Sequence, residues 1–100
     1  AEAVKWFRKA AEQGVADAQK NMGLALRDGR GMAKDEVEAV KWFRKAAEQG
    51  YALAQFALGL ALANGRGVAK NAVEAAEWYR KAGEQRCVTA QYNLGVALAN

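Results

Sequence analysis

The chain has 100 residues, of which 52% are hydrophobic and 26% are charged, and it carries a net charge of +4. This composition excludes an intrinsically disordered chain, and no apolar stretch approaches the roughly 20 residues of a membrane-spanning helix, so we expect no membrane insertion. Lysines and arginines alternate with acidic residues and form no basic runs, which argues against a nucleic-acid-binding protein.

The sequence repeats itself every 36 residues. The run from Ala3 to Gly14 returns unchanged from Ala39 to Gly50, and 25 of the 36 residues in 1–36 are identical in 37–72. A period of this length is typical of stacked arrays, in which each unit buries its apolar face only against its neighbours. We therefore expect one array segment over residues 1–100, with repeats at approximately 1–36, 37–72 and 73–100, the last of them incomplete.

The spacing of apolar residues predicts two helices in each copy. In chain order, the helices are expected over residues 2–13, 16–28, 35–49, 52–64, 71–85 and 88–99. Asp35 is a favourable N-cap with Glu38 three residues later, and Asn71 is the equivalent cap in the next copy. Gly50 supplies the left-handed residue that ends a helix. Because every connection is short, neighbouring helices must pack antiparallel, which predicts an all-α fold of antiparallel helix pairs.

Glycine and tryptophan each recur at one position of the repeat. The glycines lie inside helices and are Gly23, Gly59 and Gly95. A glycine in a helix costs about 1 kcal/mol relative to alanine, so we expect a neighbouring backbone to approach closely at these positions. The tryptophans Trp6, Trp42 and Trp78 are expected to fill the space between helix layers.

The copies resemble the Sel1-like repeat, a relative of the tetratricopeptide repeat. The shared pattern covers the whole chain and reads Ala-x-x-Trp-Phe/Tyr-Arg-Lys-Ala-Ala-Glu-Gln-Gly, then Ala-x-Ala-Gln, Leu-Gly and Gly-Arg-Gly-Val. The resemblance implies a right-handed α/α superhelix, a solenoid that serves as an adaptor or scaffold in protein complexes. The family often has proline where Ala33 and Ala69 stand. Some of its members carry a disulfide in each repeat, and the single cysteine of this chain separates it from them.

The sequence contains no set of residues that predicts an enzyme. Histidine and serine are absent, and the single cysteine has no imidazole to activate it. We therefore expect no catalytic residues, no metal site, no cofactor and no small-molecule substrate. The loops Gly29-Arg30-Gly31 and Gly65-Arg66-Gly67 resemble anion-binding turns, but their recurrence in the repeat favours a helix stop followed by a turn.

Comparison of the copies indicates where a partner binds. In the helices over 16–28, 52–64 and 88–99, the residues that differ between copies fall on one face, which the resemblance places on the concave side. We predict a groove there with an apolar centre and a charged end, suited to an extended peptide or an amphipathic helix. The predicted partner-binding residues are Asp17, Lys20, Arg27, Leu53, Phe56, Leu60 and Tyr92. An alternative stays open, in which Phe56 and Tyr92 pack against the next repeat.

Together these features predict a non-catalytic scaffold or adaptor that binds a peptide or helix of a partner protein on its concave face. The alternative function is self-assembly, in which terminal helices without partners stack end to end into homo-oligomers. A recurring row of lysines and arginines on the convex side is expected to pair with glutamates and keep that side soluble. Binding of acidic partners along this row is the less favoured interpretation.

Overall fold

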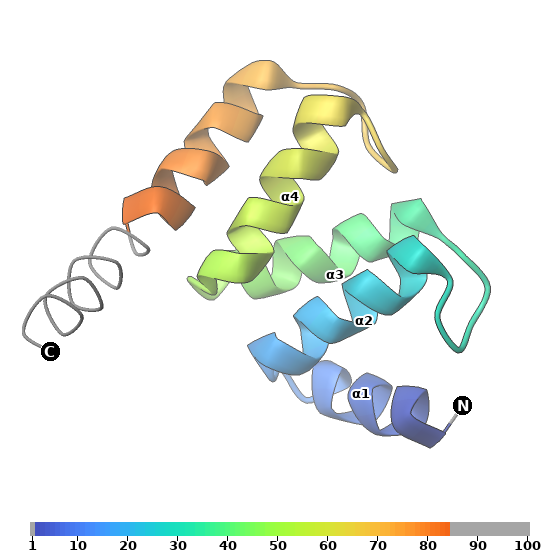
Figure 1. The fold of residues 1–100 in the computed structure, drawn as a ribbon. Helices are drawn as coiled ribbons and strands as arrows, with labels where there is room; N and C mark the ends of the chain where they lie inside the picture. Colours follow the sequence, from blue (N-terminus) through green and yellow to red (C-terminus); the bar gives the residue numbers. More distant parts are fainter. Residues whose placement is uncertain (1, 85–100) are drawn as a thin grey trace, which may run out of the picture.

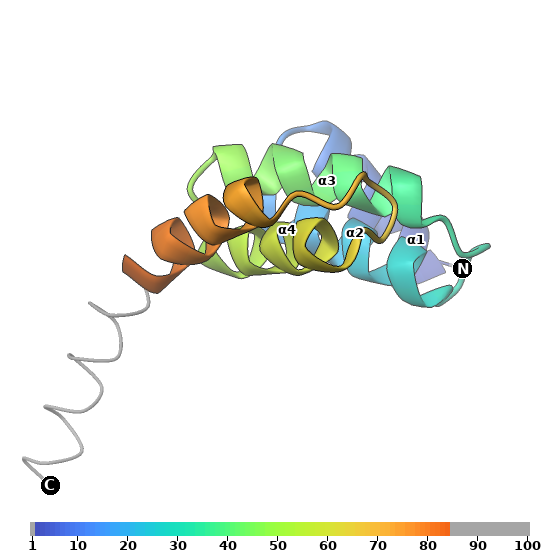
Figure 2. The same cartoon turned by 90° about the horizontal axis from the view of Figure 1, so that it is seen from above.

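The computed structural model describes residues 2–84, with side chains from residue 5 onward. The described residues form α1 (Glu2–Glu12), α2 (Ala16–Asp28), α3 (Glu36–Glu48), α4 (Ala52–Asn64) and a further helix that covers residues 72–84. Successive helices pack on one another along the chain (Figure 1), and α3 contacts both α2 and α4. Seen from above, α3 lies on one side of α2 and α4 (Figure 2). The predicted all-α solenoid is confirmed, and the helix expected over 88–99 lies outside the described residues.

The helix ends follow the capping residues. The Asp35 carboxylate accepts a hydrogen bond from the backbone N–H of Glu38 at 3.0 Å, and Asn71 accepts the equivalent bond from Glu74 at 3.0 Å. Gly50 has a φ of +88°, a left-handed conformation that glycine adopts without a steric penalty. These predicted caps are confirmed, and the ends of α1 to α4 lie within one residue of their predicted positions.

Buried glutamines join each helix pair in the same way 36 residues apart. The Gln19 side chain donates to the carbonyl of Ala11 at 3.1 Å, and Gln55 donates to the carbonyl of Ala47 at 3.2 Å. The carbonyl in each case belongs to the last turn of the preceding helix and also accepts a backbone N–H from just beyond that helix, Ala11 from Gly14 at 3.0 Å and Ala47 from Gly50 at 2.9 Å. Gln49 also donates to Gln19 at 2.8 Å, so the glutamines link successive repeats.

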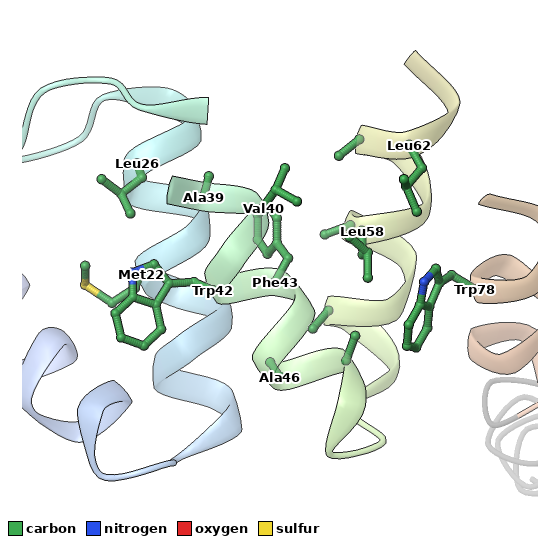
Figure 3. Close-up of a cluster of buried hydrophobic side chains, with 14 of the residues drawn as sticks. Met22, Leu26, Ala39, Val40, Trp42, Phe43, Ala46, Leu58, Leu62 and Trp78 are labelled. Carbon is green, nitrogen blue, oxygen red and sulfur yellow. The ribbon is translucent and has the colours of Figure 1, made fainter. Parts of the chain in front are cut away.

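The core lies between α2, α3, α4 and the 72–84 helix. Its largest fully buried side chains are Phe43, Met22, Leu58 and Leu62. Figure 3 shows Met22 and Leu58 with Leu62 on the two sides of α3, which itself carries Phe43 and the fully buried Ala46. Because many of the other core residues are alanines, the helices are held by close approach more than by bulky side chains.

The recurring glycines accommodate aromatic rings. A Cβ on Gly23 would lie 2.5 Å from the ring of Phe43, and a Cβ on Gly59 would lie 2.8 Å from the ring of Tyr79. The predicted close approach is therefore correct, and the nearest group in both cases is an aromatic side chain of the following helix. At Gly59 a neighbouring backbone also approaches as expected, because the carbonyl oxygen of Ala75 lies 3.4 Å from the added Cβ, whereas at Gly23 the three nearest atoms all belong to Phe43. Gly95 lies outside the described residues.

The three tryptophans do not share one environment. Trp42 and Trp78 are 8% and 9% exposed and fill the space between helices as predicted, whereas Trp6 is 69% exposed. The prediction is wrong for Trp6, because α1 packs on α2 and its Trp6 face contacts no other described helix. The same position of the repeat is thus buried in α3 and exposed in α1.

The arginines of the recurring basic row contact glutamates of the following repeat. Arg44 donates to Glu74 at 3.0 Å, and Arg8 lies 4.0 Å from Glu38. The indole N–H of Trp78 also donates to Glu74 at 3.1 Å, and the two hydrogen bonds, that of Trp78 first, lower the pKa of this carboxyl. The pairing expected for this row is confirmed for these two arginines, and it connects neighbouring repeats.

Candidate partner-binding surface

Three large apolar side chains of α4 are exposed on one side of the helix. Leu53, Phe56 and Leu60 have exposed fractions of 50%, 40% and 36%. Their spacing of three and four residues places them one turn apart along a single stripe. Leu58 and Leu62, on another face of the same helix, are fully buried. We call Leu53, Phe56 and Leu60 the α4 stripe.

Phe56 belongs to the α4 stripe and also contacts the next repeat. Its ring centroid lies 5.5 Å from that of Tyr79, with the two rings tilted by 50°. An offset or tilted arrangement at this distance is favourable for aromatic pairs. Both interpretations of Phe56 therefore describe part of its surroundings, because the side chain packs on Tyr79 and still leaves 40% of its surface exposed.

Two of the predicted charged residues form contacts within the chain. Asp17 accepts a hydrogen bond from the hydroxyl of Tyr51 at 2.6 Å, and the amine of Lys20 lies 3.7 Å from the same carboxylate. The hydrogen bond to Asp17 is the main cause that raises the pKa of Tyr51, since deprotonation would place two negative charges together. Asp17 and Lys20 are accordingly engaged in a contact between repeats, at the opposite end of α2 from Arg27.

Arg27 and Leu60 meet at one cavity. The cavity has a volume of about 260 Å³ and lies between α2 and α4, with α3 beneath it. Its lining residues are Arg27, Glu36, Ala39, Val40, Phe43, Ala57, Leu60, Ala61, Asn64 and Arg66. Apolar side chains thus form most of its wall, and charged groups of α2, α3 and the loop after α4 stand around it. We call it the α2–α4 cavity.

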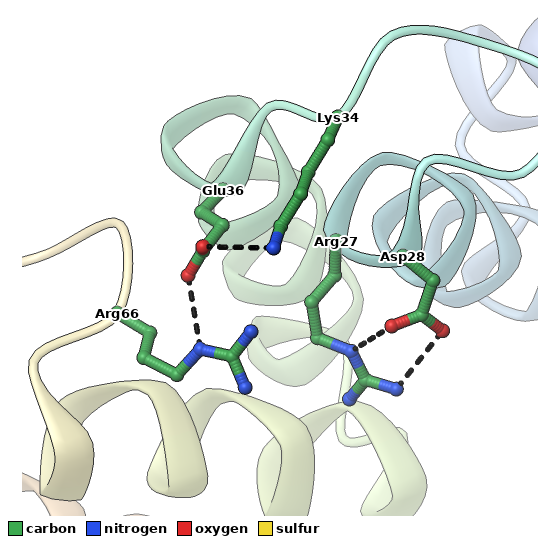
Figure 4. A network of polar contacts seen from close by, with 5 residues as sticks. All are labelled: Arg27, Asp28, Lys34, Glu36 and Arg66. Carbon is green, nitrogen blue, oxygen red and sulfur yellow. Dashed lines mark hydrogen bonds and ion pairs between the residues drawn. The ribbon is translucent and has the colours of Figure 1, made fainter.

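We call the end of the α2–α4 cavity that is lined by Arg27, Glu36 and Arg66 its opening, and Figure 4 shows the polar contacts of these residues with Asp28 and Lys34. Arg27 donates to both oxygens of Asp28, at 3.0 and 3.2 Å, and Arg66 donates through Nε to Glu36 at 3.0 Å. Lys34 lies 3.6 Å from Glu36. The hydrogen bond from Arg27 lowers the pKa of Asp28, and that from Arg66 lowers the pKa of Glu36. Both carboxyl groups are therefore ionised at neutral pH.

The structure thus brings together some of the predicted residues and separates others. Arg27 and Leu60 share the α2–α4 cavity, whereas Leu53 and Phe56 continue the α4 stripe away from it. Tyr92 lies outside the described residues. Sequence reasoning missed Glu36 and Arg66, because Arg66 is identical to Arg30 in the other copy and was assigned to a helix stop.

The described residues contain neither a membrane-spanning helix nor a cluster of three metal ligands. No helix there is long and apolar enough to cross a membrane. Histidine, cysteine, aspartate and glutamate side chains do not gather into a group of three that would hold a metal ion in residues 2–84.

Comparison with known proteins identifies what the repeat resembles. The family model described as Sel1 repeat matches residues 1–15, 16–51, 52–87 and 88–100, which together span the chain. No curated protein matches.

Three solved structures share the fold. A Sel1 repeat protein from Oxalobacter formigenes is 52% identical, with a TM-score of 0.80 over 82% of this chain and 34% of its own. A protective antigen of uropathogenic Escherichia coli with an SLR fold is 48% identical, with a TM-score of 0.82 over 83% of this chain and 18% of its own. Cysteine-rich protein B of Helicobacter pylori is 24% identical, with a TM-score of 0.80 over 83% of this chain and 62% of its own. This chain therefore spans less than two thirds of each relative.

Proposed function

This chain belongs to the Sel1 repeat family, and we propose that it is a scaffold segment that binds a peptide or helix of a partner protein along the α4 stripe. Sel1 repeat proteins are generally protein-interaction scaffolds, and the family is typically non-catalytic. In this proposal the face that carries the stripe is the concave side of the array. The partner's apolar side chains contact Leu53, Phe56 and Leu60, and its polar groups contact the charged residues of α2.

The single observation that carries the proposal is the exposure of the α4 stripe. Exposed leucines or phenylalanines are unremarkable one at a time, but three in a row along one helix form a continuous apolar surface. The equivalent positions of α2 are Asp17, Lys20 and Leu24, so the repeat does not require an apolar residue at the positions of Leu53 and Phe56. A surface of this kind suits apolar anchors spaced along an extended or helical peptide.

A selection experiment tests the proposal. The immobilised protein is exposed to a phage-displayed library of random peptides, and the affinity of each selected peptide is then measured by fluorescence anisotropy. Replacement of Leu60 by glutamine is expected to weaken binding about tenfold or more, because a central apolar anchor of an interface contributes 2 kcal/mol or more. The control is Val73→Gln, which makes the same kind of change at a more exposed apolar side chain at the start of the 72–84 helix.

Phe56→Ala separates binding from packing. If Phe56 is mainly a partner contact, this change weakens peptide binding and lowers the melting temperature only slightly. A sharp fall in melting temperature with unchanged peptide binding would show that Phe56 serves to pack on Tyr79, and the groove proposal would fail.

A second candidate function is end-to-end self-association, and the exposure of Trp6 favours it. Trp6 and Phe7 of α1 occupy the positions that in α3 belong to Trp42 and Phe43, which pack against α2. The sequence over 88–99 repeats the pattern of α2 and α4, with Gly95 in the position of Gly23. In this candidate, that segment of one copy covers Trp6 of the next, which would extend the array from molecule to molecule.

A further inference from the structure

We propose that the α2–α4 cavity binds the C-terminal residue of the partner peptide, with its apolar side chain inside the cavity and its carboxylate between Arg27 and Arg66. This inference rests on the proposed function, because it specifies which kind of peptide the same face binds. It concerns one end of the α4 stripe, where Leu60 lines the cavity.

The size and lining of the cavity suit a single apolar side chain. Phe43 and Val40 of α3 and Ala57 and Leu60 of α4 form its apolar wall. Its volume of about 260 Å³ is below the roughly 300–1,000 Å³ of pockets that enclose drug-sized ligands. One leucine-sized group with its attached carboxylate is an appropriate occupant, whereas a cofactor is too large.

Hydrogen-bond donors remain available at the opening. Arg66 uses only its Nε toward Glu36, and its Nη1 and Nη2 groups make no hydrogen bond to any described residue. Arg27 uses Nε and Nη2 toward Asp28, which leaves Nη1 without an acceptor among the described residues. A guanidinium group carries five N–H donors, so both arginines retain some for a ligand. Figure 4 shows the two guanidinium groups on the same side of the network, with no acceptor drawn between them.

The local charge favours an anion. The network of Figure 4 contains three cationic side chains, Arg27, Lys34 and Arg66, and two carboxylates, Asp28 and Glu36, so its net charge is +1. Arg66 also lies near enough to lower the pKa of Asp28, although Arg27 has the larger effect. Both guanidinium groups line the same cavity, and a ligand carboxylate placed between them would accept charge-assisted hydrogen bonds from both.

A C-terminal residue supplies both required groups from one Cα atom. Its side chain and its carboxylate leave the same carbon, so a single residue reaches the apolar wall and the arginines together. An internal residue has no carboxylate there and would continue the chain past the arginines on its far side. Aspartate and glutamate carry a carboxylate but too little apolar surface to fill the cavity.

The charges at the opening belong to one pair of repeats. The position of Arg27 in α2 is taken by Ala63 in α4, and the position of Glu36 is taken by Ala72. The repeat therefore folds without an arginine at this place, and the partner of Arg27 is its own neighbour Asp28, not a residue of another helix. The Arg27–Asp28 pair does not recur in α4, and for this reason we assign Arg27 to ligand binding.

The experiment uses acetyl-Ala-Ala-Ala-Leu with a free C-terminal carboxylate and the same peptide as a C-terminal amide. Binding of each is measured from amide chemical shifts in two-dimensional NMR spectra. We expect the acid to bind about tenfold more tightly than the amide, as a charge-assisted pair of hydrogen bonds predicts. The largest shifts are expected at Ala57, Leu60 and Ala61.

Arginine variants test the assignment, and Arg27→Ala is chosen because the next copy has alanine there. In Arg27→Ala and in Arg66→Gln, the preference for the acid should fall to about twofold or less. Arg80→Gln, an exposed arginine of the 72–84 helix, is the matched control and should keep the full preference. Equal binding of acid and amide to the unmodified protein, or no binding of either, would overturn the inference. If library-selected peptides still bind in a Leu60-dependent manner in that case, the proposed function stands and only this inference fails.

Discussion

The ring of Phe43 lies directly on Gly23, so that a Cβ at this glycine would stand 2.5 Å from the nearest ring carbon. Phe43 is the largest fully buried side chain of the protein's core. The contact joins α2 to α3 across the boundary between two repeats, and Gly59 and Tyr79 form the equivalent contact in the next repeat. A glycine that weakens its own helix therefore permits the packing that holds the array together.

We predict that Gly23→Ala destabilises the protein even though alanine is the better helix former. The gain of about 1 kcal/mol in helix propensity is outweighed by an overpacking cost of about 1–3 kcal/mol, because the buried Phe43 ring must shift to admit the added Cβ. Thermal unfolding followed by circular dichroism measures the result. The matched control is Gly83→Ala in the 72–84 helix, where an added Cβ meets nothing within 4 Å. That variant should melt at a higher temperature, and a stabilised Gly23→Ala would refute the role assigned to the ring.

Gln55→Met should lower the free energy of unfolding by about 1 kcal/mol, the usual contribution of one intramolecular hydrogen bond. Methionine has a similar length and keeps the site filled, so the loss reports the amide that donates to the Ala47 carbonyl. Chemical denaturation with urea measures it. Gln13→Met, at an exposed position just after α1, serves as the control and should leave stability nearly unchanged. Equal stability of the two variants would mean that the buried glutamine does not hold the helix pair.

The contact of Glu74 with Arg44 and Trp78 should make stability depend on acid pH. The folded chain lowers the pKa of Glu74 below its ordinary value of 4.5, so the folded state binds this proton less tightly than the unfolded state. The stabilisation is therefore present above pH 4.5 and disappears as the pH falls through the lowered pKa. Glu74→Gln should cost about 0.5 kcal/mol at pH 7, because the pair is partly exposed. This deficit should shrink as the pH falls below 4.5 and vanish once the pH is below the lowered pKa of Glu74.

Melting temperatures of the unmodified protein and of Glu74→Gln, recorded from pH 7 to pH 3, check this dependence. Glu77→Gln removes an equal charge from an exposed position of the same helix and controls for net charge. A deficit for Glu74→Gln that stays constant across the whole range would show that the charge of Glu74 is not its cause.

Trp6 gives the test of self-association. If the exposed face of α1 is covered by a second copy, the mass measured by light scattering should rise with protein concentration. Trp6→Gln should then hold the protein as a monomer of 10.8 kDa. Val37→Gln, which also changes an exposed apolar side chain, should behave like the unmodified protein. A monomer at every concentration would exclude the end-to-end candidate and leave the α4 stripe as the surface to explain.

The fold could be predicted well from the sequence because the same pattern of apolar and capping residues occurs in successive copies. The apolar spacing of α3, the cap at Asp35 and the turn at Gly50 are local features, and each was placed correctly. The exposure of the α4 stripe could also be predicted from the sequence, because residues that differ between copies occupy positions that packing does not constrain. The prediction that failed concerns the environment of Trp6, which matches Trp42 in sequence but is 69% exposed where Trp42 is 8% exposed.

The charged opening of the α2–α4 cavity could not be predicted for a different reason. Arg66 and Glu36 are 30 residues apart and meet only when the loop after α4 folds back beside the start of α3. Arg66 is also identical between copies, so a comparison of copies treats it as structural. Only the three-dimensional arrangement brings Arg66 and Arg27 to the same opening.

The most direct test of the central claim, that the α4 stripe binds a partner peptide, is NMR mapping of a library-selected peptide on the isotopically labelled protein. We predict that the largest amide shift changes fall at Leu53, Phe56 and Leu60 and at the neighbouring α2–α4 cavity. Changes confined to Trp6 and Phe7 of α1, or to the lysines of α3 on the opposite side, would place the binding surface elsewhere and contradict the account.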